Sequence, residues 1–561
     1  MLNIKKPLIL LTVLISFTVT GCLHKETYQK KEIISVDKNQ YLNMTLESEP
    51  QGLDPSKDYD TSSIQVLTEV NEALTRIEKD KNGNEVVKPA GAKGWKVTSD
   101  GLNWTFYLRN NKWSDGRKVT AKDYEYGIKR TLNPNIRSKK AYLLYNIKGA
   151  KIYNTSNYNV SSDIVSVKAL DDNTLKITLE APCAYFLKLT SFSFMQPQRE
   201  DIVKKYTDKY GSDSNSTVFC GPFLLKQWIH GDRVELIKNN NYWDKNSVKL
   251  QKATMEVLKE NNTIYSRLLN GSIDIANIIQ PDLKNKLDKQ NKFNVISVSE
   301  PTTDFDVFNQ SNKYFKNVNI RKAFSLAVDR EEVSKTLWKG LYTSAYGLVS
   351  PSIQIGNENF RKKVNQEPVK QLQELGENPK KLLNKGLKEI GFDGDPSSIT
   401  ITYLEPDTDY EQKNIAEFLK NMYQKNLGIN IKVEYVPWDK FESKILSGDY
   451  EFASMIWTAD FNDPLSELLM WSKDSQMVKI NWNDKNYDSL IKKAAILPQS
   501  QNDQRFENLK KAENILITQD AVISPIDYRN NNVYKRKYIK NLMCNSFGSL
   551  YEIKYAYTNG R

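Results

Sequence analysis

The sequence predicts two unlike halves, the first α+β and the second α/β. In the first third, apolar and polar residues alternate over 102–108, which is typical of a half-buried strand. A second alternation over 165–179 is interrupted by Asp171-Asp172-Asn173 and predicts a hairpin. In the second half, apolar residues recur at helical spacing, and no fixed-length repeat is found. Two lobes of different construction are therefore expected.

Individual elements follow from local signals in chain order. Thr120 and Asp123 form a capping-box-like pair at the start of a helix that Asn133-Pro134 should end. Apolar stripes predict helices over 320–328 and 415–423. Segments 399–404 and 429–435 should be strands on either side of the second of these helices. The three together predict a βαβ crossover with parallel pairing.

Size and charge restrict the class of protein. With 561 residues, 39% of them hydrophobic, the chain is long enough for several packed domains. The net charge is +12, but lysines and carboxylates are interleaved, so no basic stripe predicts nucleic-acid binding. A basic surface near anionic lipid is the simpler interpretation.

The N-terminus predicts export and lipid anchoring. Lys5 and Lys6 precede an apolar run over 8–19 that is too short to span a bilayer as a stable helix. Val19-Thr20-Gly21-Cys22 resembles the bacterial lipobox, so we expect removal of residues 1–21 and acylation of Cys22. Acyl chains contribute roughly 0.8 kcal/mol per buried methylene. The polar segment 22–40 would then be a tether, and the body would face outside the cytoplasm.

Few residues are available for metal binding or enzymatic chemistry. Cys183, Cys220 and Cys544 are an odd number without close spacing, which predicts neither a disulfide framework nor a zinc site and allows at most one bridge. His24 and His230 are the only histidines, which leaves little material for a metal site or a Ser-His-Asp triad. Phosphate-binding and nucleophile-elbow motifs are also missing. We therefore expect no metal, no cofactor and no enzyme.

Several short strings occur in a fixed order over 45–561. The most specific is Trp113-Ser114-Asp115-Gly116 followed by Val119-Thr120-Ala121-Lys122-Asp123. The later strings are Gly221-Pro222-Phe223, Asn241-Tyr242-Trp243, Ala327-Val328-Asp329-Arg330 and Trp457-Thr458-Ala459-Asp460-Phe461-Asn462-Asp463-Pro464. In these strings the chain resembles the oligopeptide- and dipeptide-binding proteins of ABC importers, solute-binding protein family 5.

The resemblance implies a two-lobed clamshell of the large, three-subdomain type. Its first lobe would contain 41–71, 190–300 and 529–561, with an extra subdomain over 72–189, and its second lobe would contain 301–528. Ligand would bridge the lobes and select a closed form that a membrane permease recognises. A monomer is expected.

The resemblance also implies a peptide site centred on Asp460, which would pair with the ligand's α-ammonium. An ammonium taken out of water needs a fixed anion, so this role is chemically reasonable. Backbone of Trp457, Thr458 and Ala459 would hold one side of an extended peptide by strand addition. The other residues that the resemblance assigns to the site are Tyr59, Asp60, Thr61, Trp438, Cys220, Gly221 and Tyr528.

Two positions depart from the family pattern. Cys220 stands where many relatives have asparagine, and Ser454 stands where some have an arginine that meets ligand carboxylate. The binding of the ligand's C-terminal end is therefore left open.

The function that these observations predict is capture of peptides outside the cytoplasm and delivery to an ABC importer permease. A receptor for signalling peptides would look the same. A carrier of a nickel complex, haem or sugar on the same fold is a further alternative, disfavoured by the two histidines and by the context of Asp460. A secreted enzyme lacks any supporting motif.

Overall fold

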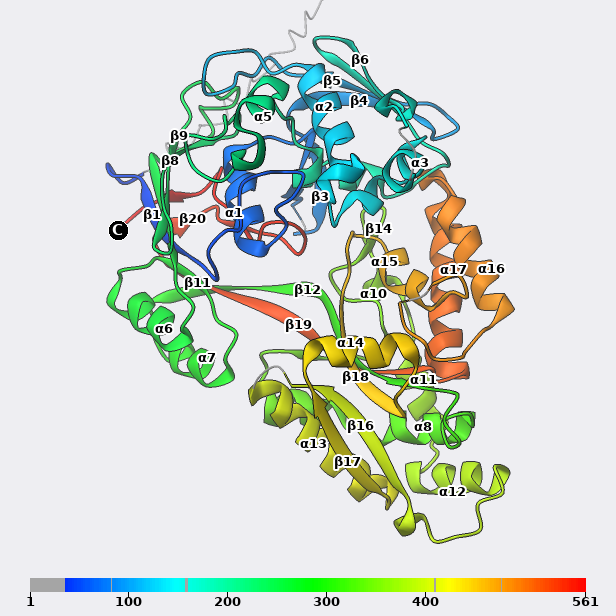
Figure 1. Cartoon of the computed structure of the whole chain (residues 1–561). Coiled ribbons are helices and arrows are strands. Elements are labelled where there is room, and N and C mark those ends of the chain that lie inside the picture. Colours follow the sequence, from blue (N-terminus) through cyan, green and yellow to red (C-terminus); the bar gives the residue numbers. More distant parts are fainter. Residues whose placement is uncertain (1–35, 82, 157–159, 408–409, 476) are drawn as a thin grey trace, which may run out of the picture.

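The computed structural model describes residues 36–561 apart from 82, 157–159, 408–409 and 476. Cys22, the predicted signal segment and most of the predicted tether lie outside the described residues. Within the described part of the chain, no helix is both long and apolar enough to cross a membrane. Two lobes joined by long strands are visible in Figure 1.

The first lobe is built on a four-stranded sheet of order β1-β10-β9-β8. Its strands are β1 (Tyr41–Leu46), β8 (Phe223–Ile229), β9 (Arg233–Lys238) and β10 (Lys252–Val257). Helix α1 (Thr61–Val70) contributes Val66 and Val70 to the core of this lobe, and Ile539 and Ile553 of the C-terminal segment enter the same core. Three distant stretches of chain therefore share one core, seen as blue, green and red ribbon in Figure 1.

The subdomain contains an antiparallel sheet of order β4-β5-β7-β6. Its strands are β4 (Ala92–Val97), β5 (Asn103–Leu108), β6 (Val167–Asp171) and β7 (Thr174–Thr178), and β2 (Thr75–Lys79) pairs separately with β3 (Glu85–Pro89). Trp104 and Phe106 of β5 are buried, which confirms the predicted alternation, and β6 and β7 form the predicted hairpin. Helix α2 (Ala121–Thr131) starts where Asp123 accepts the Thr120 N–H at 2.8 Å, as predicted.

The second lobe is organised around a larger sheet of order β11-β19-β12-β18-β16-β17. Its strands are β11 (Ile275–Asn277), β12 (Phe293–Phe308), β16 (Thr400–Pro406), β17 (Asn430–Val436), β18 (Phe452–Thr458) and β19 (Ile523–Arg536), with β13 (Thr343–Ser344) paired to β19. The predicted βαβ unit is confirmed, because β16 and β17 are parallel and α13 (Tyr410–Leu427) connects them. Phe324 and Tyr423 from the two predicted helical stripes pack on Phe452 of β18.

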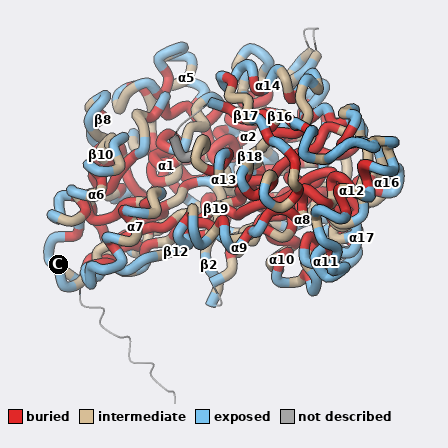
Figure 2. Tube along the Cα trace, turned by 90° about the horizontal axis from the view of Figure 1, so that it is seen from below, coloured by how far each residue is buried: buried red, intermediate tan, exposed pale blue. Residues whose placement is uncertain are grey.

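Helices and short strand pairs complete the fold. The longer helices are α6 (Asn261–Asn270), α7 (Pro281–Asp288), α8 (Val318–Ala327), α12 (Pro379–Glu389), α14 (Trp438–Ser447), α16 (Lys485–Ile496) and α17 (Asn502–Asn514). The shorter ones are α3 (Ala150–Thr155), α4 (Phe186–Leu189), α5 (Glu200–Tyr206), α9 (Arg330–Glu332), α10 (Phe360–Lys363), α11 (Pro368–Glu374) and α15 (Leu465–Leu468). The short strand pairs are β14 (Gln354–Ile355) with β15 (Glu358–Asn359), β20 (Ile539–Lys540) with β23 (Tyr557–Thr558), and β21 (Met543–Cys544) with β22 (Tyr551–Glu552). Figure 2 shows that buried chain fills the interior of the molecule and that exposed turns and helices lie outside it.

The strands β12 and β19 connect the two lobes. They pair antiparallel from Phe293↔Arg536 to Val307↔Ile523, and the register shifts between Ser299 and Thr303. Val298 lies in the core of the first lobe, whereas Phe305 lies in a core shared by the subdomain and the second lobe. The ladder is therefore irregular at 299–303, where the two strands pass from one core to the other.

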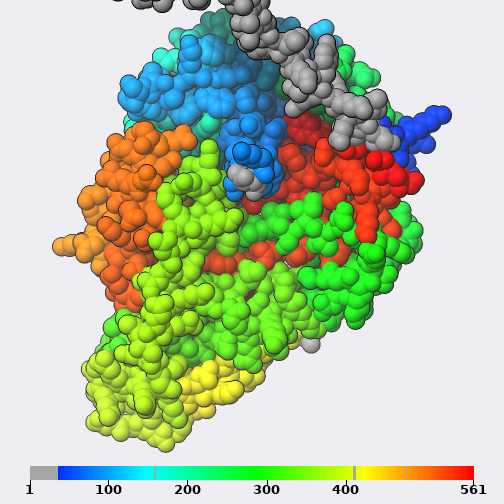
Figure 3. All heavy atoms as spheres, turned by 180° about the vertical axis from the view of Figure 1, so that it is seen from behind, coloured from blue at the N-terminus to red at the C-terminus, as the bar shows by residue number. Residues whose placement is uncertain are grey.

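The subdomain also packs against the second lobe. One buried apolar cluster includes Trp104 and Phe186 of the subdomain together with Phe461 and Phe506 of the second lobe. The rings of Tyr185 and Phe461 stack with centroids 4.2 Å apart. Seen from behind in Figure 3, the orange residues of the second lobe lie against the blue and cyan residues of the subdomain.

Candidate functional site

Strand β18 presents an unpaired edge in the second lobe. The N–H of Ala459 donates to the Pro301 carbonyl at 2.7 Å, so alternation along the ladder directs residues 453, 455, 457 and 459 toward β12. The backbone groups of Ser454, Ile456 and Thr458 then point to the opposite edge. On that edge β16 meets β18 only at Phe452 and Ala453. Among the described residues, 454–458 therefore have no strand partner there, and this edge can accept an extended chain.

Asp460 lies just beyond the end of this edge and is held in place by two contacts of its own segment. Its N–H donates to Ser466 Oγ at 2.7 Å, and the indole N–H of Trp457 donates to the Ser466 carbonyl at 3.1 Å. These bonds fix the backbone of the turn after β18, from which the Asp460 side chain extends.

The carboxylate of Asp460 meets the subdomain. Lys140 Nζ lies 2.7 Å from Asp460 Oδ1, and their side chains are 34% and 20% exposed. Burial raises the pKa of the Tyr142 phenol, and the negative charge of the neighbouring Asp460 raises this pKa further. The anion is therefore already partnered by a lysine ammonium, which is the same chemical group as a peptide amino terminus.

The predicted segment Tyr59-Asp60-Thr61 lies beside the same stretch of the subdomain. The Tyr59 hydroxyl is hydrogen-bonded to Ser138 Oγ, two residues before Lys140. Asp60 caps α1 by accepting the Ser63 N–H at 2.9 Å, and Thr61 is the exposed first residue of that helix. Residues 138–142 thus touch both Tyr59 of the first lobe and Asp460 of the second, so the structure brings both predicted halves of the site to one segment.

The remaining predicted residues differ in how far they are exposed to solvent. Trp438 begins α14, is 58% exposed and stacks on Phe441 with ring centroids 5.7 Å apart. Cys220 and Gly221 are buried, and both N–H groups donate to the Val70 carbonyl at 3.1 and 2.8 Å. A side chain at Gly221 would collide with the backbone of 70–71, so this position serves packing. Peptide contact by these three residues stays a prediction.

Tyr528 lines a pocket of about 390 Å³ in the second lobe. Its hydroxyl donates to the Gly347 carbonyl at 2.8 Å and is buried. Arg361 lines the same pocket, but its guanidinium is ion-paired with Glu367 and Glu513. This arginine is therefore already neutralised, and the binding of a ligand carboxylate remains unassigned.

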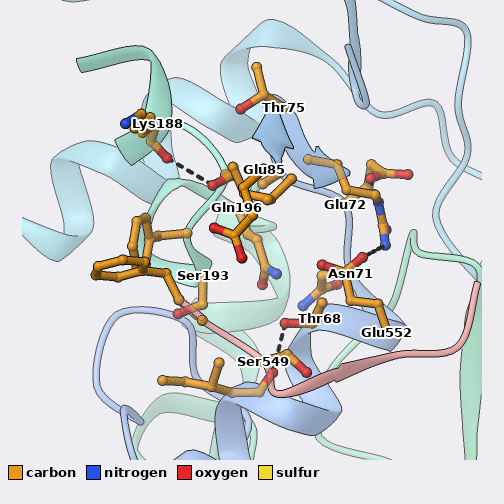
Figure 4. A pocket seen from close by; sticks show the side chains of 18 of the residues that line it. Thr68, Asn71, Glu72, Thr75, Glu85, Lys188, Ser193, Gln196, Ser549 and Glu552 are labelled. Carbon is orange, nitrogen blue, oxygen red and sulfur yellow. Dashed lines mark hydrogen bonds and ion pairs between the residues drawn. The ribbon is translucent and has the colours of Figure 1, made fainter. Parts of the chain in front are cut away.

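A second, smaller cavity lies between α1, the β2–β3 hairpin and the C-terminal segment (Figure 4). It measures about 60 Å³, which is too small for a peptide. Asn71 Oδ1, Arg76 Nε and Gln196 Oε1, all from its lining, lack hydrogen-bond partners among the described residues. A polar cavity of this size suits a few ordered waters.

Sequence reasoning missed the residues that join the subdomain to the second lobe. Lys188 of α4 is buried, and its Nζ donates to the carbonyls of Asn462 at 2.8 Å and Gln354 at 3.2 Å. Burial lowers the pKa of Lys188 to about 8. Lys140 and Lys188 are two of 80 basic residues, and nothing near them in the sequence distinguishes a lysine that contacts a residue hundreds of positions away.

Metal and redox chemistry gain no support from the described residues. Cys183, Cys220 and Cys544 are buried and unpaired there. The described part of the chain also contains no cluster of three or more histidine, cysteine or acidic side chains arranged to hold a metal ion.

The comparisons with known proteins identify the family. The model of bacterial extracellular solute-binding proteins, family 5 Middle, matches residues 86–479, and the chain belongs to this family. The chain is 33% identical over 558 residues to the dipeptide-binding protein DppE of Bacillus subtilis, with 97% of each chain covered. It is 32% identical over 520 residues to the oligopeptide-binding protein OppA of the same organism, with 91% of each chain covered.

The fold agrees with this assignment. The structure of Listeria monocytogenes OppA bound to peptide matches with a TM-score of 0.70 and 28% identity, covering 94% of this chain and all of that one. The predicted fold class, an α/β clamshell with an α+β subdomain, is thereby confirmed.

Proposed function

We propose that this protein binds peptides outside the cytoplasm and delivers them to the permease of an ABC importer. The observation that carries this proposal is the free edge of β18, which runs toward a fixed carboxylate at Asp460. An edge of unpaired backbone groups binds any extended peptide irrespective of its side chains, and a carboxylate at its end selects an amino terminus. The names of the relatives in Bacillus subtilis support the same ligand class.

The remaining parts of the proposal concern location and mechanism. Acylation of Cys22 would anchor the protein in the membrane and the tether would hold its body at the outer surface. Closure about 299–303 would bring the Tyr59 segment and the β18 edge onto opposite sides of the ligand. A closed, ligand-bound form is then what a permease can distinguish from the empty protein. No catalytic step is part of this function.

Mass spectrometry of the molecules released by denaturing the purified full-length protein tests the ligand class. We expect peptides of mixed sequence, because backbone recognition does not select side chains. Recovery of a metal chelate, haem or a sugar in place of peptides would reject the proposal. A single peptide sequence would favour a signalling receptor over a nutrient importer.

A further inference from the structure

Lys140 occupies the position in which the amino terminus of a ligand is expected. It comes from the subdomain, immediately before the short helical segment 141–144, whereas Asp460 follows β18 in the second lobe. The two residues are 320 positions apart in the sequence, and Lys140 Nζ lies 2.7 Å from Asp460 Oδ1. Among the described residues, the Lys140 ammonium has no other ion-pair partner.

A lysine ammonium and a peptide α-ammonium are chemically equivalent toward a carboxylate. Both carry one positive charge and three N–H donors, and neither can accept a hydrogen bond. They therefore compete for Asp460 Oδ1, the carboxylate oxygen that Lys140 Nζ already occupies at 2.7 Å.

We propose that Lys140 is the resident counter-ion of Asp460 and is displaced by the α-ammonium of an incoming peptide. This inference rests on the proposed function and adds a residue that sets ligand selectivity. With a free amino terminus, the ligand replaces Lys140 on the carboxylate. With a blocked amino terminus, Lys140 stays and keeps Asp460 from being buried without a partner.

The subdomain contact does not depend on Lys140 alone. Lys188 and the Tyr185–Phe461 stack join the same two parts of the molecule through buried contacts. Replacing Lys140 is therefore expected to leave the fold and this interface intact, and to change only the competition at Asp460.

The test compares Lys140→Met with Lys139→Met in the full-length protein. Lys139 is the exposed neighbour and has no ion pair within the described residues, so it controls for loss of one positive charge. The probes are a synthetic random library of two- to six-residue peptides and the same library acetylated at the amino terminus. Bound peptide is measured by mass spectrometry over a concentration series.

For the free library, Lys140→Met should bind about two- to sixfold more tightly than Lys139→Met. The partly exposed Lys140–Asp460 pair then no longer competes with the peptide ammonium for the carboxylate. For the acetylated library, Lys140→Met should bind about tenfold more weakly, because closure would bury a carboxylate that has lost its cation and keeps only the Tyr142 hydroxyl as a partner. Equal binding of the free library by both variants would overturn the inference. Weaker binding of the free library by Lys140→Met would also overturn it, since Lys140 would then contact the ligand directly.

The same experiment separates this inference from the proposed function. If the wild-type protein binds neither library, the proposed function fails and the inference fails with it. If the wild type binds the free library but the two lysine variants do not differ, only the role of Lys140 is lost.

Discussion

Replacing Asp460 by asparagine is expected to weaken binding of peptides with a free amino terminus by about thirtyfold to a thousandfold. Asparagine keeps the shape of the side chain and removes its charge. Breaking one side of a desolvated ion pair costs about 3 to 5 kcal/mol. The same substitution frees the ligand from competition with Lys140, and a pair as exposed as Lys140–Asp460 is worth at most about 1 kcal/mol. The net loss is then about 2 to 4 kcal/mol, which gives the stated range.

Isothermal titration calorimetry with a peptide recovered from the wild type measures this loss. An acetylated version of the same peptide is the control, because it has no ammonium and should bind the wild type and Asp460→Asn with similar affinity. If the wild type binds the free and acetylated peptides equally well, Asp460 does not recognise the amino terminus. Thermal unfolding should barely change, since the partly exposed pair with Lys140 is worth about 1 kcal/mol or less and the backbone contact of Asp460 to Ser466 does not need the carboxylate.

Three further predictions concern the free edge, the pH dependence of stability and the anchor. Ile456→Pro removes one N–H donor from the free edge of β18, whereas Ile456→Val keeps that donor. The proline variant should bind peptide about two- to tenfold more weakly than the valine variant, and equal affinities in calorimetry would argue against strand addition. Burial, and then the nearby Glu552 carboxylate, raises the pKa of fully buried Glu69 from 4.5 to about 8, so its contribution to stability is full below pH 4.5 and is lost as the pH rises toward 8. Glu69→Gln cannot ionise and should gain on the order of 4 kcal/mol over the wild type between pH 5 and 8 in denaturant unfolding, whereas parallel pH profiles would show that Glu69 titrates normally. Cys22→Ser should release the protein from the membrane fraction, and retention after a high-salt wash would mean that acylation of Cys22 is not the anchor.

Local periodicity was sufficient to predict those elements in which the spacing of apolar residues within one continuous stretch determines which side chains are buried. The alternation in β5, the β6–β7 hairpin and the βαβ unit of β16, α13 and β17 all follow from spacings of two or of three to four residues. In each case the pattern of buried side chains is set within a continuous stretch of fewer than forty residues, so the sequence signal is complete.

The features that make the site were not predictable in this way. The free edge of β18 exists because β16 leaves it after Ala453, which depends on how two strands about fifty residues apart diverge. The register shift in β12 at 299–303 depends on pairing with β19, more than 200 residues later. Asp460 was found only through the family string, and its contact with Lys140 was not found at all, because a single lysine carries no pattern.

The subdomain contacts the two lobes in different ways. On the side of the first lobe, buried ion pairs join Arg76 to Glu552 at 2.6 Å and Arg130 to Asp54 at 2.5 Å. On the side of the second lobe, the Lys140 and Asp460 side chains are one-third and one-fifth exposed, and a pair so accessible to water is worth about 1 kcal/mol or less.

The second lobe also makes buried contacts with the subdomain, because Phe186 and Phe461 belong to one apolar cluster. The Tyr185–Phe461 stack adds about 0.5 to 1.5 kcal/mol. Lys188 donates two hydrogen bonds to carbonyls of the second lobe. Burial lowers the pKa of its ammonium to about 8, because removal from water disfavours the charged form. The subdomain is thus held to the first lobe by buried ion pairs and to the second lobe by a shared apolar cluster that includes Phe186 and Phe461. In the proposed exchange, the peptide ammonium would replace Lys140 at this partly exposed pair and leave the apolar cluster in place.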